Sequence, residues 1–294
     1  MLDRPATSNT GIQVIKPEPF PVAGLLCGKP VEEAAEILPR LFNLCRKAQS
    51  VAIRMALGLP VEKDHGVGEE IRDEHVLRLA IMLPGRLGID LVPFPRNNSD
   101  ALVDALFGDA DVLDHPLAFN AFLESRHGIA PVLSEIRARF HPYDASPPPM
   151  LLVNACSILS LSPLENSVAA RHEDHPVLRF IEASYGRGPF WRVSARAIDL
   201  HAILLGHVPE PRLVAPGFAV VPVARGLSAI RAVTERGRVK HLKRMVPTDH
   251  LLATGGLLEQ SLAALPEARR HLAGLLMDIL DPCVPVRLGG TQDA

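Results

Sequence analysis

Cysteines are the residues of this 294-residue sequence whose side chains could bind a soft metal or take part in redox chemistry. The four of them are Cys27, Cys45, Cys156 and Cys283. No two stand at the CxxC spacing of a zinc site or a dithiol redox centre, and their wide separation argues against disulfides. A free cysteine is most often a small buried hydrophobic residue, so packing is the other interpretation of each.

A second polar group lies at 171–175, where the sequence RHEDH places two imidazoles and two carboxylates within five residues. Imidazole and carboxylate ligands suit first-row divalent ions, so a metal site is one interpretation. No further ligands stand at a convincing spacing, which favours a solvated polar turn before Pro176. The motifs of phosphate-binding loops, dinucleotide-binding folds, serine hydrolases and HExxH zinc proteases are absent.

The charge balance argues against two classes of partner. The chain has 31 Lys plus Arg against 33 Asp plus Glu and a formal net charge of −2, so it lacks a basic footprint for nucleic acid or for an anionic membrane. No stretch reaches the roughly 18 apolar residues of a membrane-spanning helix, and the start has no apolar run typical of a signal peptide. We therefore expect a cytoplasmic protein that binds neither nucleic acid nor membrane.

Helices should position most of these residues. Leu, Ala and Val supply the core while aromatic residues make up only 4% of the chain, a composition that favours helices. The apolar spacing predicts a long, central and buried helix over 39–57, in which Cys45 and Gln49 lie one turn apart. Further helices are predicted from Val31 and over 68–83, 99–107, 117–126, 129–139, 150–160, 176–184, 189–205 and 266–280.

The pattern changes late in the chain, where β-branched residues become frequent. Segments 218–223, 229–235 and 238–246 read as strands, and the last two flank a predicted hairpin turn at 236–237. The fold class is therefore mainly α with a small antiparallel β element near 216–246, an α+β arrangement. We expect a single domain over 1–294, with the proline-rich segment 141–149 as a loop inside it.

Four basic residues would lie on one edge of this hairpin. They are Lys240, His241, Lys243 and Arg244. A charged edge strand that blocks aggregation explains them without any ligand, and a surface that docks a partner is the alternative.

Several short elements together resemble the large subunits of nickel–iron hydrogenases. GKP at 28–30 and LPRLFNLCRKAQ at 38–49 are similar to that family's N-terminal signature, in which a GRP-type turn leads to PRxCGxCxxxH. VARG at 223–226 and VPT at 246–248 resemble its APRG and VP[ST]TWN elements, and DPC at 281–283 resembles its DPCxxC. The elements follow the family's order, which implies a truncated fold of the hydrogenase large-subunit type.

Departures from the family pattern change the chemistry that the resemblance implies. In the family, each CxxC supplies two of the four thiolates that hold nickel and iron. Here Phe42 and Val286 replace one cysteine of each pair, and Gln49 stands where the family has His. Two thiolates remain, so the resemblance implies no nickel site and no hydrogenase activity.

This pattern is similar to that of the HupK-type hydrogenase maturation proteins, shortened relatives of the large subunit that act in assembly. The resemblance implies that Cys45 and Cys283 transiently hold an Fe(CN)2(CO) fragment before its transfer to the large-subunit precursor. Arg225 and Thr248 would each donate to one cyanide nitrogen, and the nearby arginine would help to lower the thiol pKa. The implied partners are that precursor and other hydrogenase maturation proteins.

A metal-free pseudo-subunit is the alternative hypothesis. Such a chaperone would dock maturation factors or the large-subunit precursor, and its two cysteines would be packing residues. Replacing both by Ala would then leave hydrogenase maturation intact. A third hypothesis, an active hydrogenase of altered type, is disfavoured because nickel would have two cysteine ligands at most.

Overall fold

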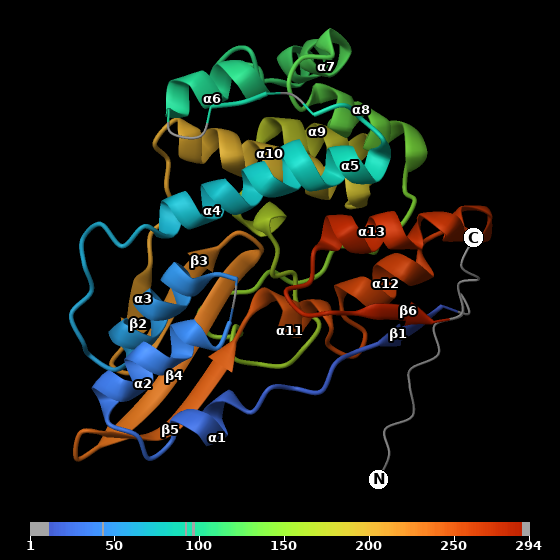
Figure 1. The fold of residues 1–294 in the computed structure, drawn as a ribbon. Coiled ribbons are helices and arrows are strands. Elements are labelled where there is room, and N and C mark those ends of the chain that lie inside the picture. The colour runs from blue at the N-terminus through green and yellow to red at the C-terminus, as the bar shows by residue number, and fades with distance from the viewer. Residues whose placement is uncertain (1–11, 43, 92, 96–97, 290–294) are drawn as a thin grey trace.

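The computed structural model describes residues 12–42, 44–91, 93–95 and 98–289. A group of helices and an antiparallel sheet make up most of it, and the C-terminal helices lie beside both (Figure 1). The prediction of an α+β fold dominated by helices is confirmed. Within these described ranges, no helix is both long and apolar enough to cross a membrane.

The helical part is built around two long segments. α4 (Val67–Val76) continues through the π-helical segment η2 (Leu77–Met82) into α5 (Leu83–Leu87), and α4 packs against α10 (Pro189–Leu204). α10 begins with proline, whose missing N–H costs nothing at the first helical position, and almost all of its residues are buried. The surrounding helices are α6 (Ser99–Leu106), α7 (Pro116–Ser125), α8 (Ala130–Arg139), η3 (Val168–Arg171) and α9 (Pro176–Tyr185).

The sheet has four antiparallel strands in sequence order. They are β2 (Arg212–Ala215), β3 (Phe218–Val223), β4 (Gly226–Glu235) and β5 (Arg238–Met245). The predicted hairpin turn at 236–237 is confirmed, since Glu235 pairs with Arg238 and both turn residues have positive φ. β5 is the last strand of the sheet, and residues 28–31 pair with its first residues, so the edge that a charged strand would protect is its second half.

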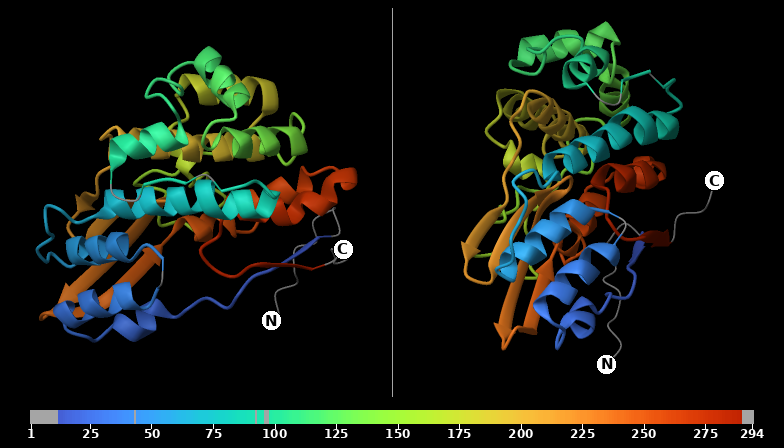
Figure 2. Two further views of the ribbon diagram at one scale, coloured as in Figure 1. Left: turned by 45° about the horizontal axis from the view of Figure 1, so that its top comes forward. Right: turned by 60° about the vertical axis from the view of Figure 1, so that its left-hand side comes forward.

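The N-terminal helices cover one face of the sheet (Figures 1 and 2). They are α1 (Val22–Leu26), α2 (Val31–Ile37), η1 (Leu38–Arg40) and α3 (Arg46–Ala56). Ile53 of α3 shares a buried apolar cluster with Ile230 of β4 and Leu242 of β5. On the opposite face, Val220 packs with Ile158, which belongs to the loop before η3. The sheet is thus covered over part of both faces.

The last part of the chain returns to its beginning. Four helical segments follow the sheet: α11 (Pro247–Leu251), α12 (Leu257–Ala263), η4 (Glu267–Leu272) and α13 (Ala273–Leu280). The chain then passes Cys283 and forms β6 (Arg287–Gly289), which pairs with β1 (Gln13–Ile15). Segments from the two ends of the sequence therefore lie side by side.

The predicted helix 39–57 is wrong in its first half. η1 ends at Arg40, and α3 begins only at Arg46, after Cys45 with a left-handed backbone (φ 57°). The start of α3 is set from outside, because the Glu70 carboxylate accepts hydrogen bonds from the N–H groups of Lys47 (2.8 Å) and Ala48 (3.0 Å). The apolar spacing of 39–57 cannot predict this contact, because Glu70 belongs to α4.

The helix predicted over 150–160 is also wrong. The Asn154 side chain accepts hydrogen bonds from the N–H groups of Cys156 (2.9 Å) and Ser157 (3.1 Å), a local turn that competes with a helix. The last predicted helix is 3₁₀ over its first residues, in η4. The sequence prediction omitted the three short strands β1, β2 and β6, and the short helices α1, α11 and α12.

Candidate functional site

One cavity of about 310 Å³ is lined by both cysteines that the resemblance selects. Cys45 precedes α3 and Cys283 follows α13, so the fold brings together distant parts of the sequence at this point. Arg225 lines the same cavity. The remaining lining residues are Leu41, Phe42, Leu44, Gln49, Val223, Ser228, Arg244, Val246 and Pro247.

Cys45 is held at the first turn of α3. Its carbonyl oxygen accepts the N–H of Gln49 at 2.9 Å, so these two residues are one turn apart as predicted. The left-handed conformation of Cys45 is uncommon for a residue with a side chain and joins the preceding segment to the helix.

The Cys45 thiol is protonated at neutral pH in this environment. Burial raises its pKa to about 12, and this outweighs the lowering by the nearby Arg225 guanidinium. The carboxylates of Glu70 and Glu74 raise it as well. Arg225 does lower the thiol pKa, as expected, but desolvation is the larger effect and the pKa of Cys45 stays high.

Thr248 positions the backbone of Cys283. Its hydroxyl oxygen accepts the Cys283 N–H at 2.9 Å from a buried position in α11. Thr248 itself lines a smaller neighbouring cavity of about 40 Å³, which Arg225 also lines. Thr248 is therefore not among the residues that line the cysteine cavity, and its hydrogen bond with the Cys283 N–H connects it to that cavity. Within the described ranges the threonine hydroxyl donates to no other group, so its proton is available to a ligand.

Arg225 occupies a tight turn between β3 and β4. Val223 and Gly226 form the last pair of the hairpin, and Gly226 has φ 142°. A Cβ atom on Gly226 would lie 2.5 Å from the side-chain oxygen of Asn166, so glycine is required there. The Arg171 guanidinium donates at 2.9 Å to the carbonyl oxygens of both Val223 and Gly226, which fixes the turn.

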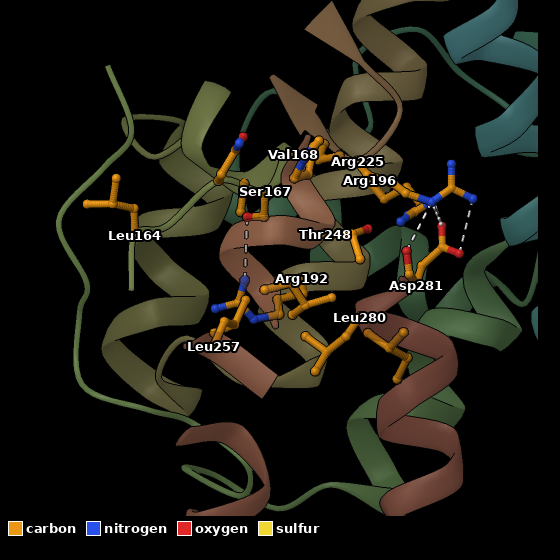
Figure 3. A pocket seen from close by; sticks show the side chains of 15 residues that line it. Leu164, Ser167, Val168, Arg192, Arg196, Arg225, Thr248, Leu257, Leu280 and Asp281 are labelled. Carbon is orange, nitrogen blue, oxygen red and sulfur yellow. Dashed lines mark hydrogen bonds and ion pairs between the residues drawn. The ribbon is translucent and has the colours of Figure 1, made fainter. Parts of the chain in front are cut away.

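The Arg225 guanidinium is only partly satisfied. It donates to the Asp281 carbonyl (3.0 Å) and carboxylate (3.2 Å) and to the Glu74 carboxylate (3.1 Å). Its Nη1 is buried and has no hydrogen-bond partner in the described part of the chain. Arg78 and Arg196 also form ion pairs with Asp281, and Figure 3 shows Arg196 and Arg225 meeting at that carboxylate. The group thus contains three guanidiniums and two carboxylates.

Arg244 is a site residue that the sequence interpretation missed. Its Nε donates to the Gln49 side-chain oxygen at 2.8 Å, and its guanidinium lies 4.1 Å from the centre of the Phe42 ring. Lys240, His241 and Lys243 are exposed, as a charged edge requires, but Arg244 is half-buried. The signal was present in the sequence, because alternation along a strand places position 244 on the same face as the buried Leu242.

The segment 171–175 is partly buried and belongs to a different network. Arg171 and His172 both contact the buried Asp199 carboxylate, at 2.5 Å and 2.6 Å, and His175 caps the start of α9. The interpretation as a solvated turn is therefore wrong for Arg171 and His172. Within the ranges described, no cluster of three or more His, Cys, Asp or Glu side chains is placed to hold a metal ion.

A comparison with characterised proteins identifies the family. The chain is 43% identical over 286 residues to the hydrogenase expression/formation protein HupK of Rhodobacter capsulatus, and the match covers 96% of this chain and 94% of that protein. This chain belongs to the HupK family. The family prediction made from the sequence elements is confirmed. No family model matches the chain.

The fold of this HupK-family chain is similar to that of a hydrogenase. It matches the Ni-Fe-Se hydrogenase of D. vulgaris Hildenborough, in both the reduced and the as-isolated oxidized state, with a TM-score of 0.60. The match covers 92% of this chain and 95% of the hydrogenase chain at 12% sequence identity. At this identity the likeness concerns the fold alone, and it confirms the predicted large-subunit type.

The chemistry of the HupK-family cavity suits a soft metal with anionic ligands. Cys45 and Cys283 offer two sulfur donors, which favour iron and other thiophilic metals. The buried Nη1 of Arg225 offers a charge-assisted hydrogen bond that the protein leaves unused. A buried donor without a partner is costly, so an anionic group at this position would relieve the cost. The residues present therefore fit an anionic iron complex.

Proposed function

We propose that this protein takes part in hydrogenase maturation by holding an Fe(CN)2(CO) fragment through Cys45 and Cys283. One observation carries the proposal: both thiols and a buried, unpartnered guanidinium nitrogen of Arg225 belong to residues that line the same cavity. The role of the HupK relative in hydrogenase expression and formation supports the same role for this chain. The fragment is cargo in this account, the site contains no nickel, and the chain is an assembly protein rather than an enzyme.

Binding of the fragment requires loss of the thiol protons. Burial raises the pKa of Cys45 to about 12, so iron must displace a proton that burial otherwise retains. Loading should therefore be tighter at higher pH. The same cost lowers the net affinity of the site, which favours later release of the fragment.

Arg225 and Thr248 would contact the diatomic ligands. The free Nη1 of Arg225 can donate to one cyanide nitrogen while its other nitrogens keep their carboxylate partners. The Thr248 hydroxyl accepts from the Cys283 backbone and can donate its own proton to the second cyanide. The Thr248 contact would link the position of one cyanide to the position of Cys283.

Two thiolates rather than four make a site from which the fragment can leave. A site with fewer protein ligands exchanges its metal more readily with a better one, and the hydrogenase large-subunit precursor would supply that better site. The partners in this account are the precursor and other maturation proteins, and the setting is the cytoplasm.

The metal-free chaperone remains the competing function, and one observation favours it. The high pKa of Cys45 is typical of a buried thiol that packs rather than reacts. Under this hypothesis the surface of the large-subunit-like fold binds the partners, and the two thiols have no chemical role.

A maturation assay separates these functions. The double variant Cys45→Ser/Cys283→Ser should lose most hydrogenase maturation, measured as hydrogen-dependent dye reduction in a host whose own copy is deleted. The matched control Cys27→Ser/Cys156→Ser changes two exposed cysteines outside the cavity and should mature hydrogenase normally. Full maturation with the first pair replaced would refute the scaffold and support the metal-free chaperone.

A further inference from the structure

Arg244 brings a second guanidinium to the cavity that contains the two thiols. Its strand β5 lies at the edge of the sheet, yet its side chain is on the face that the N-terminal helices cover. The register shows this directly, because Arg244 pairs with the buried Ile230 whereas the exposed Lys243 pairs with the exposed Arg231. Protection of the sheet edge explains Lys243 and does not explain Arg244.

Two neighbours hold Arg244 in place without neutralising it. Gln49 accepts a hydrogen bond from Nε, and the Phe42 ring lies against the guanidinium. Both are neutral side chains, and no ion pair of Arg244 is present in the described part of the chain. The nearby Asp249 carboxylate accepts the Val246 N–H at 2.7 Å at the start of α11. The positive charge of Arg244 therefore lacks a direct acidic partner.

Charged groups surround the cavity, and most of them are paired or hydrogen-bonded within the protein. Arg78, Arg196 and Arg225 form ion pairs with Asp281 and Glu74, while the carboxylates of Glu70 and Asp249 accept backbone N–H groups at the starts of α3 and α11. Arg244 differs from the other three guanidiniums because it forms no ion pair in the described part of the chain. An iron(II) ion with two cyanides is neutral, so two thiolate ligands make the bound complex a dianion. Arg244, held by neutral neighbours, and the unpartnered Nη1 of Arg225 offer the positive charge and the donor that such a dianion requires.

We propose that Arg244, from strand β5, is the second cationic partner of the cargo, beside Arg225 from the β3–β4 turn. Together the two arginines make the cavity selective for dianionic dithiolate complexes of iron. Gln49 and Phe42 are then positioning residues for Arg244. The identity of the cargo rests on the proposed function. The charge that Arg244 brings to the cavity is a property of this chain alone, and it is testable without iron.

Alkylation of the thiols tests the charge of the cavity. The rate with anionic iodoacetate is divided by the rate with neutral iodoacetamide for each cysteine, measured by mass spectrometry on the full chain. The exposed Cys27 and Cys156 serve as internal references. The ratio should be higher at Cys45 and Cys283 than at the references, and Arg244→Gln should lower it by about fivefold. Lys243→Gln, the same charge change one residue away, should leave it unchanged.

An unchanged ratio in folded Arg244→Gln would overturn the proposal, and so would an equal effect of Lys243→Gln. Thermal unfolding followed by the fluorescence of the buried Trp191 establishes that each variant is folded. If Arg244→Gln does not fold, Gln49→Ala replaces it, since it frees the guanidinium from its hydrogen bond. That variant should also lower the ratio at Cys45, and no change there would overturn the proposal.

Iron retention gives the second readout. The protein is purified anaerobically from a host that makes the fragment. The Arg244→Gln variant should retain about one tenth of the iron found in the wild type, or less, because one charge-assisted contact is lost. Arg244→Lys should restore much of the iron and shift the cyanide stretching bands. Equal iron in wild type and Arg244→Gln would refute the role of Arg244. Wild type without any iron would instead refute the proposed cargo, while the alkylation ratio would still decide the charge of the cavity.

Discussion

Arg225 has a fixed position because the residue that follows it has no side chain. Gly226 adopts φ 142° and sits against Asn166, whose side chain donates to the Leu227 carbonyl at 2.9 Å and accepts the Leu227 N–H at 2.8 Å. Any Cβ at position 226 would displace Asn166 or the turn. The backbone of the turn therefore sets where the Arg225 side chain begins, and the hydrogen bonds to Glu74 and Asp281 hold its guanidinium.

Gly226→Ala should be more destabilising than an ordinary glycine substitution in a turn. We expect a loss of about 2 to 4 kcal/mol in the free energy of unfolding, because backbone strain and a close contact add together. Gly237→Ala is the matched control, since Gly237 also has positive φ in a hairpin turn of the same sheet but has open space around it. It should cost about 1 kcal/mol. Urea unfolding measures both, and equal losses would contradict the role of the Asn166 contact.

Residue types and motif order pointed to three residues that the fold places around one cavity, and to a fourth, Thr248, that lines the neighbouring cavity instead. Cys45, Cys283 and Arg225 line one cavity, and the sequence pointed to each through a short motif. Arg244 was assigned to a protective edge, because charge alone does not tell which face of a strand a residue occupies. The high pKa of Cys45 could not be predicted from the sequence either, because desolvation depends on the surrounding fold.

Among the elements, α3 shows how a tertiary contact sets a helix boundary. Its first turn has no acidic residue and no side-chain cap of its own. Glu70 from α4 supplies the missing acceptors to Lys47 and Ala48. The cap places Cys45 just before the helix rather than inside it.

Glu70→Ala should loosen the start of α3. Loss of a cap costs about 1 kcal/mol, and the amide protons of Lys47 and Ala48 should exchange faster with solvent. Glu69→Ala is the control, since Glu69 is exposed in the same first turn of α4 and neither of these amides donates to it. Hydrogen exchange followed by mass spectrometry measures the effect, and equal protection of α3 in both variants would contradict it.

Periodic helices and the central hairpin were predictable, whereas short elements were not. α6, α8 and α9 agree with the predicted ranges to within about two residues, because their apolar spacing and N-terminal signals are local. β1 and β6 have only three residues each and exist because the two ends of the chain meet. No local pattern could reveal that pairing.

At the scale of the whole molecule, a buried polar network joins the helical part to the sheet. His75 of α4 donates to the Asp199 carboxylate of α10 at 2.7 Å, and Arg171 links the same carboxylate to the β3–β4 turn. Burial alone would raise the pKa of Asp199, but Arg171, His172 and His75 hold it well below its usual range. Burial lowers the pKa of His75 to about 4.

Because of this network, the free energy of unfolding should decrease as the pH falls. The unfolded chain binds a proton at His75 near pH 6.5 and the folded chain only near pH 4, so protonation favours unfolding as the pH falls through this window. The contribution that is lost is of the order of 3 kcal/mol. Unfolding monitored by Trp191 fluorescence should show lower stability at pH 5 than at pH 7.

His75→Gln should flatten this dependence, because the amide can still donate to Asp199 and does not titrate. His241→Gln is the matched control, since His241 is exposed on β5. An equally steep dependence in wild type and His75→Gln would show that other groups carry the effect.

The central claim is that two cysteines from opposite ends of the chain hold one iron fragment. Infrared spectroscopy of protein purified without oxygen from a host with the hydrogenase maturation machinery tests it most directly, because cyanide and carbonyl stretches fall where protein groups do not absorb. We predict these bands in the wild type, in Cys27→Ala and in Cys156→Ala, and their loss in Cys45→Ala and in Cys283→Ala. Bands that persist in either cavity variant, or a wild type without bands or iron while hydrogenase still matures, would contradict the account.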